Sequence, residues 1–281
     1  MDDLIETPVT LATAPHLAGV LVRPQTPKLA VLVNGATGVK AGFYLAFARW
    51  LAKERHAAVL VWDYRDFGAS GAPYRSTATM TDWAIHDPLT ARRWLQEQAP
   101  GVPLWLIGHS LGGMAAAFQD DANTFERIIT VAAGHGHIRA HPWPYRAKVY
   151  LLWYLLGPVG TAVLGYLPGR RIGLGNDLPK GVFWQWRDWL LDPAALPGDA
   201  RLGGVRDPGF AGPLTLVAMA DDALIPPPCV ARMARWHPHA RAETRILHPA
   251  DFGLTAIGHI HPFAPRNAAC WPAIIAPPAH G

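Results

Sequence analysis

The chain has 281 residues, half of them hydrophobic, and this proportion is enough to bury the core of one large domain. We therefore expect most of the chain to be ordered. Charged residues make up 16% of the sequence, against about 25% in typical soluble domains, and twelve Trp are many for this length, so we expect some apolar surface to face a ligand, a lipid or a partner. The net charge of +4 comes from Lys and Arg residues that are scattered along the sequence. Because no basic run is interleaved with aromatic residues, we expect no nucleic-acid partner.

The N-terminal segment and the cysteines indicate the cellular compartment. Residues 1–6 are acidic, and Pro8 follows before any long apolar run can form, which is unlike a secretory signal. Cys229 and Cys270 stand outside any metal-ligand or redox spacing, so we expect neither a zinc site nor a disulfide framework. Together these features favour a cytoplasmic protein.

One uncharged segment, residues 149–167, has about the length of a membrane-spanning helix. Gly157, Pro158 and Gly160 interrupt its middle, where a proline removes a backbone donor and clashes with the preceding turn. We therefore expect two short helices rather than one membrane span, and we do not expect contact with a membrane.

Short runs rich in Val, Ile and Leu alternate with helix-like segments, as in a mostly parallel sheet that helices cover on both faces. Strands are expected at residues 17–22, 29–33, 58–62, 104–107, 128–132, 214–219 and 244–247. Helices are expected at residues 42–55, 82–98, 111–120 and 227–236. This βαβ succession predicts an α/β fold.

The alternation stops between residues 134 and 206, a stretch crowded with Trp, Tyr, Pro and Gly. No segment there has the pattern of a strand, so we interpret 134–206 as a mostly helical insertion between two parts of one core, 1–133 and 207–281. Ligands of open α/β sheets bind at the carboxyl ends of the strands, where such an insertion forms a lid. The tail, residues 267–281, is rich in Ala and Pro, and we expect it to be partly disordered.

The strongest chemical signal is the segment Gly-His-Ser-Leu-Gly at residues 108–112, which follows the apolar run 104–107 and precedes the small residues 114–117. This order predicts a strand, a sharp turn and a helix. The turn needs glycines two residues on either side of the serine, because a Cβ there would clash where strand and helix converge. Such a turn exposes the hydroxyl of Ser110 at the edge of the sheet.

With this motif the chain resembles the α/β-hydrolase superfamily, whose nucleophile lies in Gly-x-Ser-x-Gly and whose triad runs serine, acid, histidine along the chain. Within the insertion, residues 166–179 and the pair Trp186 and Trp189 look like a group of predicted bacterial α/β-hydrolases whose substrates are largely unassigned. The resemblance covers nearly the whole chain. It implies the α/β-hydrolase fold, with a mostly parallel central sheet, helices on both faces and a helical cap.

The resemblance places the acid and the base of the triad after the serine. The acid-bearing strand of the superfamily ends in Asp-x-x-Val/Ile-Pro, which matches residues 222–226 and selects Asp222 over Asp221. We expect one of the two aspartates to cap the following helix. The superfamily's histidine lies in a loop after the last strand, where a glycine precedes His259, so His259 is the expected base and His261 the alternative.

A hydrolase of this kind also needs two N–H donors for the negatively charged oxygen of its intermediate. In the superfamily the first donor is the amide of the residue after the nucleophile, which is Leu111 here. The second comes from the loop after an early strand. That loop aligns with residues 34–38, so the resemblance implies Ala36 or Thr37 as the second donor.

Residues 63–70 resemble the Asp-x-Arg-Gly-x-Gly-x-Ser segment that follows the next strand in many of these hydrolases. The role of that segment is mainly structural. We therefore assign Asp63 and Arg65 to support of the loop and not to catalysis, with Asp66 standing where glycine is usual.

Two further patterns suggest a cofactor or a metal only weakly. Gly173 and Gly175 lack the strand that precedes a nucleotide-binding loop, so we expect a tight turn there. His135, His137 and His141 have a spacing that suits a metal, yet no carboxylate or cysteine joins them. We therefore expect neither a cofactor nor a bound metal.

The resemblance implies acyl transfer, in which His259 accepts the proton of Ser110 and Asp222 orients the imidazole. The aromatic insertion favours a small-molecule substrate with an apolar acyl or aryl group, and esters and thioesters are the leading candidates. Dehalogenases and epoxide hydrolases need a carboxylate at position 110 and are disfavoured. Two alternatives remain: an acyltransferase that uses the same triad, and a non-catalytic protein that binds lipid or another ligand on a hydrolase fold.

Overall fold

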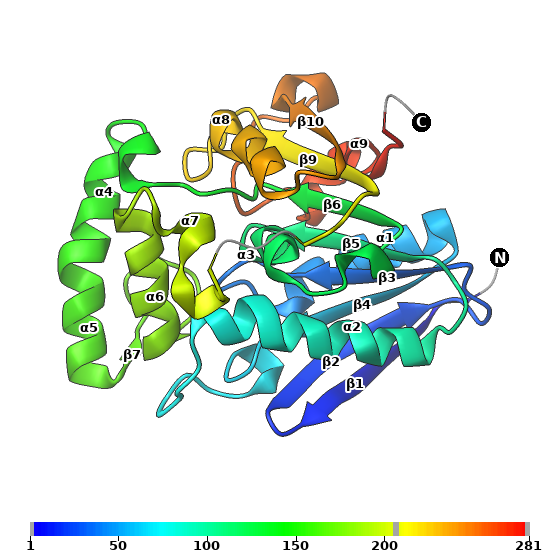
Figure 1. Ribbon diagram of the computed structural model, residues 1–281, viewed down its shortest axis with the longest axis horizontal. Coiled ribbons are helices and arrows are strands. Elements are labelled where there is room, and N and C mark those ends of the chain that lie inside the picture. Colours follow the sequence, from blue (N-terminus) through cyan, green and yellow to red (C-terminus); the bar gives the residue numbers. More distant parts are fainter. Residues whose placement is uncertain (1–2, 205–207, 279–281) are drawn as a thin grey trace.

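The computed structural model describes residues 3–204 and 208–278, and within this part a sheet of eight strands forms the centre of the molecule (Figure 1). The strands are β1 (Ile5–Thr13), β2 (His16–Arg23), β3 (Leu29–Asn34), β4 (Ala57–Asp63), β5 (Leu104–His109), β6 (Arg127–Val131), β9 (Pro213–Met219) and β10 (Arg241–Leu247). Their spatial order is β1-β2-β4-β3-β5-β6-β9-β10. β2 runs antiparallel to β1 and β4, and the other neighbouring pairs are parallel.

The central strands are continuous apolar runs because helices cover both faces of the sheet. Every residue of β3, β4 and β6 is buried. Alternate side chains enter two separate apolar clusters, one on each face, as Leu60 and Val59 do from β4. The chain therefore has the expected α/β fold with a mostly parallel sheet between two helical layers.

The helices of the core divide between these two clusters. α1 (Leu45–Arg55) and α9 (Trp271–Ile275) pack on one face, and α2 (Asp87–Gln98), α3 (Leu111–Met114) and α8 (Pro227–Ala231) pack on the other. A π-turn, Asp82–His86, precedes α2, and α3 continues as a 3₁₀ turn, Ala115–Phe118. The expected helix at residues 111–120 is thus shorter and only partly α-helical.

The sequence does not predict β1, because eight of its nine residues are exposed or only partly buried and no apolar run forms. β1 pairs with β2 as a hairpin at the edge of the sheet. The strands that the sequence does predict are all present, and most of them extend beyond the expected ends.

Between β6 and β9 the chain forms the insertion, which lies to one side of the sheet (Figure 1). Its helices are α4 (Tyr145–Leu151), α5 (Gly157–Leu164), α6 (Lys180–Leu191) and α7 (Ala195–Gly198). Contrary to expectation it also contains strands, because β7 (Tyr166–Leu167) and β8 (Leu178–Pro179) pair antiparallel. The expected limit of the insertion, at residues 206 and 207, lies outside the described residues.

The apolar segment of the insertion forms one helix, so the expectation of two short helices is wrong. α4 continues through a π-turn, Leu152–Leu156, into α5, which gives a helix from Tyr145 to Leu164. In the π-turn the amide of Gly157 donates to the carbonyl of Leu152, five residues earlier. The wider turn makes room for Pro158, whose ring and missing N–H interrupt a regular α-helix.

The C-terminal tail is packed against the sheet, so the expectation of partial disorder is wrong for the described residues up to 278. Trp271 is 4% exposed, and its indole N–H donates to the carbonyl of Pro262 at 3.0 Å. The guanidinium of Arg127 on β6 donates to the carbonyls of Ile275, at 2.9 Å, and Ala276. The tail therefore covers part of one face of the sheet despite its Ala- and Pro-rich composition.

We predict that Trp271→Ala lowers the free energy of unfolding by about 3–5 kcal/mol, because the indole packs against Phe47 and Trp50 and leaves a cavity when removed. Urea denaturation measures this change. Trp143→Ala is the matched control: Trp143 is 65% exposed, and its removal should change the free energy by no more than about 0.5 kcal/mol. Equal effects of the two substitutions would show that the tail adds no stability of its own.

Candidate active site

Ser110 lies in a sharp turn between β5 and α3, with a φ of 52°. This conformation is strained for a residue with a side chain and persists only when the surroundings hold it. A Cβ at Gly108 would overlap the backbone of Gly112, and a Cβ at Gly112 would overlap the carbonyl of Asn34. The two glycines of the motif are thus required by the close approach of β5, α3 and the end of β3.

The structure brings Ser110, His259 and Asp222 together from three distant parts of the chain. The Ser110 Oγ lies 3.0 Å from His259 Nε2, and His259 Nδ1 lies 2.8 Å from Asp222 Oδ2. Because a carboxylate only accepts hydrogen bonds, Nδ1 carries the hydrogen and Nε2 is the acceptor for the Ser110 hydroxyl. This is the tautomer that a general base needs.

The amides of Leu224 and Ile225 hold the Asp222 carboxylate in place. They donate to its Oδ1 at 2.8 and 2.9 Å, so Oδ2 remains for the histidine. The Asp222 side chain has no solvent exposure, and that of His259 is 8% exposed. A buried, fully hydrogen-bonded carboxylate keeps the imidazole in one orientation.

Asp221 supports the same loop from the other side. Its carboxylate accepts from the amides of Ile257 and Gly258 at 2.9 and 3.0 Å, and these residues directly precede His259. Neither aspartate caps the following helix, since α8 begins after Pro226 without a side-chain cap, so that expectation is wrong. The alternative base, His261, packs its ring against Phe43 instead.

His109, which precedes the serine, links the two catalytic loops. Its Nε2 donates to the backbone carbonyl of His259 at 2.8 Å, and its Nδ1 accepts from the Tyr44 hydroxyl at 2.8 Å. The Tyr44 oxygen in turn accepts from the amide of Ala36 at 2.8 Å. Burial lowers the pKa of His109 to about 3, so its ring stays neutral. A neutral ring has one donor and one acceptor nitrogen, so each hydrogen bond in this chain has one defined donor. The sequence reveals none of these partners.

This network corrects one of the expected oxyanion donors. The Ala36 amide already donates to Tyr44, so Ala36 does not serve as the second donor. Within residues 3–204 and 208–278, the amides of Thr37 and Leu111 have no backbone or side-chain acceptor, and both residues line a pocket with Ser110. The Leu111 amide is free because the first N–H groups of a helix lack partners within it. Thr37 and Leu111 are therefore the candidate donors.

Comparisons with known proteins agree with this fold. The family model described as serine aminopeptidase, S33, matches residues 25–157. Among solved structures, an esterase from Thermogutta terrifontis with bound malate is 20% identical, with 95% of each chain covered and a TM-score of 0.52. The chain has the α/β-hydrolase fold of these structures.

Two further esterases share this fold at similarly low identity. An esterase from Pyrococcus furiosus is 14% identical over 97% of this chain and 89% of its own, with a TM-score of 0.60. A carboxyl esterase from Bacillus coagulans is 14% identical over 88% and 91%, with a TM-score of 0.57. No curated protein shows significant sequence similarity to this chain.

The loop that carries Thr37 is attached to the insertion. The side-chain amide of Asn176 donates to the carbonyl of Gly38 at 2.9 Å, one residue after Thr37. Gly173 and Gly175 have φ values of 73° and 96°, so the segment before Asn176 forms the expected tight turn. The insertion therefore contributes to the position of a candidate oxyanion donor.

Asp63 and Arg65, at the end of β4 and just after it, make structural contacts, as expected. The Asp63 carboxylate accepts from the amides of Ala41 and Ala69, each at 2.8 Å. Arg65 forms an ion pair with the buried Asp87 at 2.6 Å, which fixes the start of α2. Neither residue lines the pockets beside the nucleophile.

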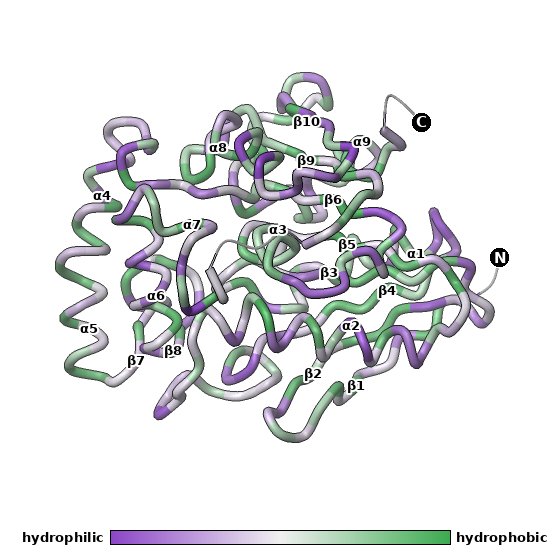
Figure 2. Tube along the Cα trace, viewed as in Figure 1, coloured by the Kyte–Doolittle hydropathy of each residue, from purple (hydrophilic) through white to green (hydrophobic). Residues whose placement is uncertain are grey.

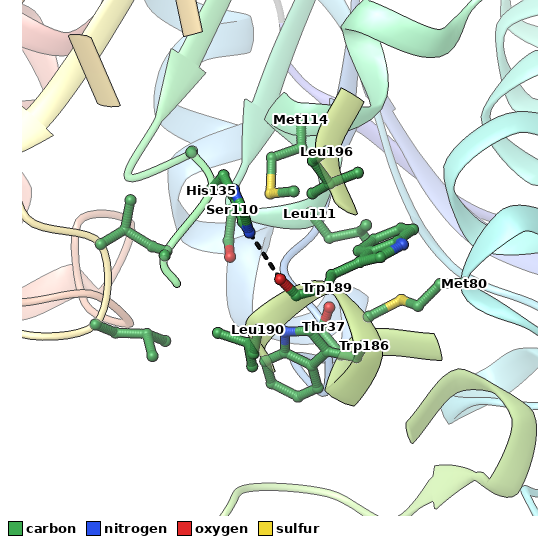
Figure 3. A pocket seen from close by; sticks show the side chains of 14 residues that line it. Thr37, Met80, Ser110, Leu111, Met114, His135, Trp186, Trp189, Leu190 and Leu196 are labelled. Carbon is green, nitrogen blue, oxygen red and sulfur yellow. Dashed lines mark hydrogen bonds between the residues drawn. The ribbon is translucent and has the colours of Figure 1, made fainter. Parts of the chain in front are cut away.

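An apolar inner pocket adjoins the nucleophile on one side (Figure 3). It has a volume of about 30 Å³ and is lined by Thr37, Met80, Ser110, Leu111, Met114, Gly134, His135, Gly136, Trp186, Trp189, Leu190, Leu196, Leu224 and Ile225. In Figure 3, Trp186, Trp189 and Leu190 of the insertion lie opposite Leu111 and Met114 of the core. Core and insertion thus enclose the pocket together.

A second cavity, which we call the outer cleft, also adjoins the nucleophile. It has a volume of about 400 Å³ and is lined by Thr37, Gly38, Val39, Ser110, Tyr145, Gly173, Leu174, Gly175, Trp186, Asp221, Ala223, Leu224, His259 and Ile260. The cleft includes His259, which the inner pocket does not. The two cavities therefore meet at Ser110 and differ in size and in their contact with the base.

The three histidines with metal-like spacing have separate partners. His135 donates to the carbonyl of Trp189 at 2.7 Å, seen as the dashed line in Figure 3, and the ring of His141 donates to the carbonyl of Ile138 at 3.1 Å. The ring of His137 accepts from the amide of Arg139. Among the described residues, no group of three His, Cys, Asp or Glu side chains is placed to hold a metal ion.

We predict that His109→Gln makes the stability of the protein less dependent on pH. The folded state holds His109 neutral down to about pH 3, whereas the unfolded chain takes up a proton near the ordinary pKa of 6.5. The unfolded state therefore binds more protons between these values, so the free energy of unfolding falls as the pH decreases through this window. The contribution of this residue is at most about 1.4 kcal/mol per pH unit.

Urea denaturation between pH 7 and pH 4 measures the slope. His109→Gln should give a shallower slope than the wild type, and the control His16→Gln, at an exposed position, should keep the wild-type slope. An unchanged slope in His109→Gln would contradict the buried, neutral role of this ring.

Proposed function

We propose that this α/β hydrolase cleaves carboxylic esters or thioesters through an acyl-enzyme formed on Ser110. The observation that supports this most strongly is the continuous hydrogen-bond chain from Ser110 Oγ through His259 to Asp222, at 3.0 and 2.8 Å. A serine hydroxyl is a weak nucleophile, and the imidazole that accepts its proton activates it. Asp222 stabilises the cation that then forms on His259.

In the first step the Ser110 oxygen attacks the carbonyl carbon while its proton moves to His259 Nε2. The carbonyl oxygen becomes negatively charged, and the amides of Leu111 and Thr37 stabilise it. His259 then donates its proton to the departing alcohol or thiol, which leaves the acyl group on Ser110. A water molecule, deprotonated by the same imidazole, attacks the acyl-enzyme and releases the acid.

The position of His259 supports a proposal for which part of the substrate each cavity holds. The leaving group must lie on the side of the residue that protonates it, and His259 lines the outer cleft. The acyl group lies on the other side of the bond that is cleaved. It then occupies the inner pocket, which His259 does not line. The outer cleft is wide enough to admit water after the leaving group departs, which favours hydrolysis over transfer to another acceptor.

The lining of the inner pocket indicates the chemistry of the acyl group. Its walls are formed mainly by Met, Leu, Ile and Trp side chains, which gain from contact with an apolar group and leave a charged group poorly solvated. A volume of about 30 Å³ has room for only a few heavy atoms. We therefore propose short, apolar acyl groups as the preferred substrates.

The lining of the inner pocket also favours an esterase over an aminopeptidase, the activity in the description of the matching family. An aminopeptidase must bind the ammonium group of its substrate on the acyl side, where a carboxylate is the usual partner. No Asp or Glu is among the residues that line the inner pocket. The nearest carboxylate of the outer cleft, Asp221, is already bonded to two amides of the histidine loop.

A series of p-nitrophenyl esters with graded acyl chains tests this proposal. We predict that acetate and butyrate esters are hydrolysed with a higher kcat/KM than the dodecanoate ester. Ser110→Ala should lower kcat by at least about a thousandfold, and Asp222→Asn by about three to four orders of magnitude, because both act in one proton-transfer unit. Ser76→Ala is the matched control and should retain full activity, since Ser76 contacts only Asp66 and its own loop.

A fluorophosphonate probe provides the independent readout. It should label the wild type and Ser76→Ala but not Ser110→Ala. Absence of labelling in well-folded wild-type protein would support the non-catalytic alternative. Turnover of charged or strongly polar acyl groups alone would show that the assignment of the inner pocket is wrong.

A further inference from the structure

The helix Tyr145–Leu164 has an apolar face that no other described part of the chain covers. It forms the outer edge of the insertion in Figure 1, on the far side of α6 from the sheet, and the tube from α5 to β7 is mostly white to green in Figure 2. The face consists of Leu151, Tyr154, Leu155, Leu156, Val159 and Val163. Tyr154, Leu155 and Val159 are 53–54% exposed, and Val163 is 75% exposed. Such exposed fractions are typical of charged side chains on a protein surface and not of large apolar ones.

The opposite face of the same helix fixes its orientation. Val149, Trp153, Gly157 and Thr161 are buried and follow one another at intervals of four residues. In a regular α-helix, residues four positions apart differ by about 40° in direction around the helix axis. The extra residue of the π-turn cancels most of the accumulated difference, so the four residues stay on one side of the helix. Trp153 stacks on Phe183 of α6 with ring centroids 5.2 Å apart. The helix is thus held on one side and exposed on the other.

Basic side chains flank this apolar face at both ends. Lys148 lies in its first turns, and Arg170 and Arg171 follow it, all three exposed. Within the described residues none of the three forms an ion pair, and the sequence contains no Asp or Glu between residues 127 and 176. Asp177 lies beside Arg170, whose backbone amide donates to its carboxylate at 3.1 Å, so positive charge exceeds negative charge at this border. An apolar face with an excess of positive charge at its borders is complementary to a surface that is apolar inside and anionic at its boundary.

Aromatic residues occupy the border as well. Trp143, just before the helix, is 65% exposed, and Arg146 lies over its ring at 5.8 Å. Arg187 lies over the ring of the exposed Tyr154 at 5.3 Å. Trp and Tyr beside Arg are enriched where proteins meet the headgroup layer of a bilayer, because their rings have an apolar body and a polar end.

We propose that the outer face of the helix Tyr145–Leu164 binds the surface of an anionic phospholipid bilayer, with the helix lying in the interface. A membrane span does not fit this fold, because the buried row on the inner face is already packed against α6. A symmetric dimer through this face fits poorly, because it would gather Lys148, Arg170 and Arg171 of both copies, against one nearby acid in each, Asp177.

The position of the helix gives this binding a consequence for the active site. Tyr145, the first residue of the helix, lines the outer cleft together with Ser110 and His259. A molecule held in the headgroup layer would therefore lie close to the mouth of the leaving-group cleft. The membrane binding itself needs no catalysis, so it is testable even if the proposed hydrolase activity is absent.

Flotation of the full chain with lipid vesicles tests the proposal. We expect the protein to float with vesicles of phosphatidylcholine and phosphatidylglycerol, and at least tenfold less with phosphatidylcholine alone or at high salt. Leu155→Glu/Val159→Glu should reduce binding at least tenfold. The matched control Ile5→Glu/Ile246→Glu changes two apolar residues of similar exposure, 44% and 45%, on β1 and β10, and should float like the wild type.

Two further variants separate the contributions. Arg170→Gln/Arg171→Gln should weaken binding to the anionic vesicles while leaving the weak binding to neutral vesicles unchanged. Ser110→Ala should float like the wild type. Circular dichroism and the unfolding midpoint establish that each variant is folded.

Three outcomes would overturn the proposal. They are no flotation of the wild type, equal flotation of Leu155→Glu/Val159→Glu and the wild type, and a dimer in sedimentation experiments that these two substitutions dissociate while vesicles have no effect. The last result would assign the apolar face to a second copy of the chain.

Discussion

The candidate site depends on the close approach of three backbone segments at Ser110. β5 turns into α3 with a positive φ at the serine, and the end of β3 passes so near that only glycine fits at positions 108 and 112. This approach has two effects at once. It exposes the hydroxyl beyond the end of β5, and it brings the start of α3 beside the loop after β3, so that the amides of Leu111 and Thr37 line the same pocket.

Side-chain hydrogen bonds, and not one scaffold element, join the loops around the nucleophile. Tyr44 and His109 connect the loop after β3 to the backbone carbonyl of His259. From the loop after β9, Asp222 bonds to the ring of His259, and the exposed Asp221 accepts from the two amides that precede this residue. The histidine loop is therefore held from two sides. The buried members of the network limit the motion of the imidazole because they are hydrogen-bonded in a low-dielectric interior.

The strands and the nucleophile were predictable from local patterns, because a parallel strand covered on both faces is a continuous apolar run and a Gly-x-Ser-x-Gly turn has strict steric needs. The edge strand β1 was not, since only Leu11 in it is buried. The acid and base followed from resemblance to a superfamily. Two features could not be predicted because they depend on contacts that no single motif encodes. They are the hydrogen bond from the Ala36 amide to Tyr44 and the π-turn that allows one helix to continue through Pro158.

The most direct measurement is a crystal structure of the protein after reaction with a fluorophosphonate. We expect a covalent bond between phosphorus and Ser110 Oγ, the phosphoryl oxygen within hydrogen-bond distance of the Leu111 and Thr37 amides, and His259 Nε2 facing the outer cleft. An unmodified Ser110, or a phosphoryl oxygen directed away from both amides, would contradict the assignment of this site to acyl transfer.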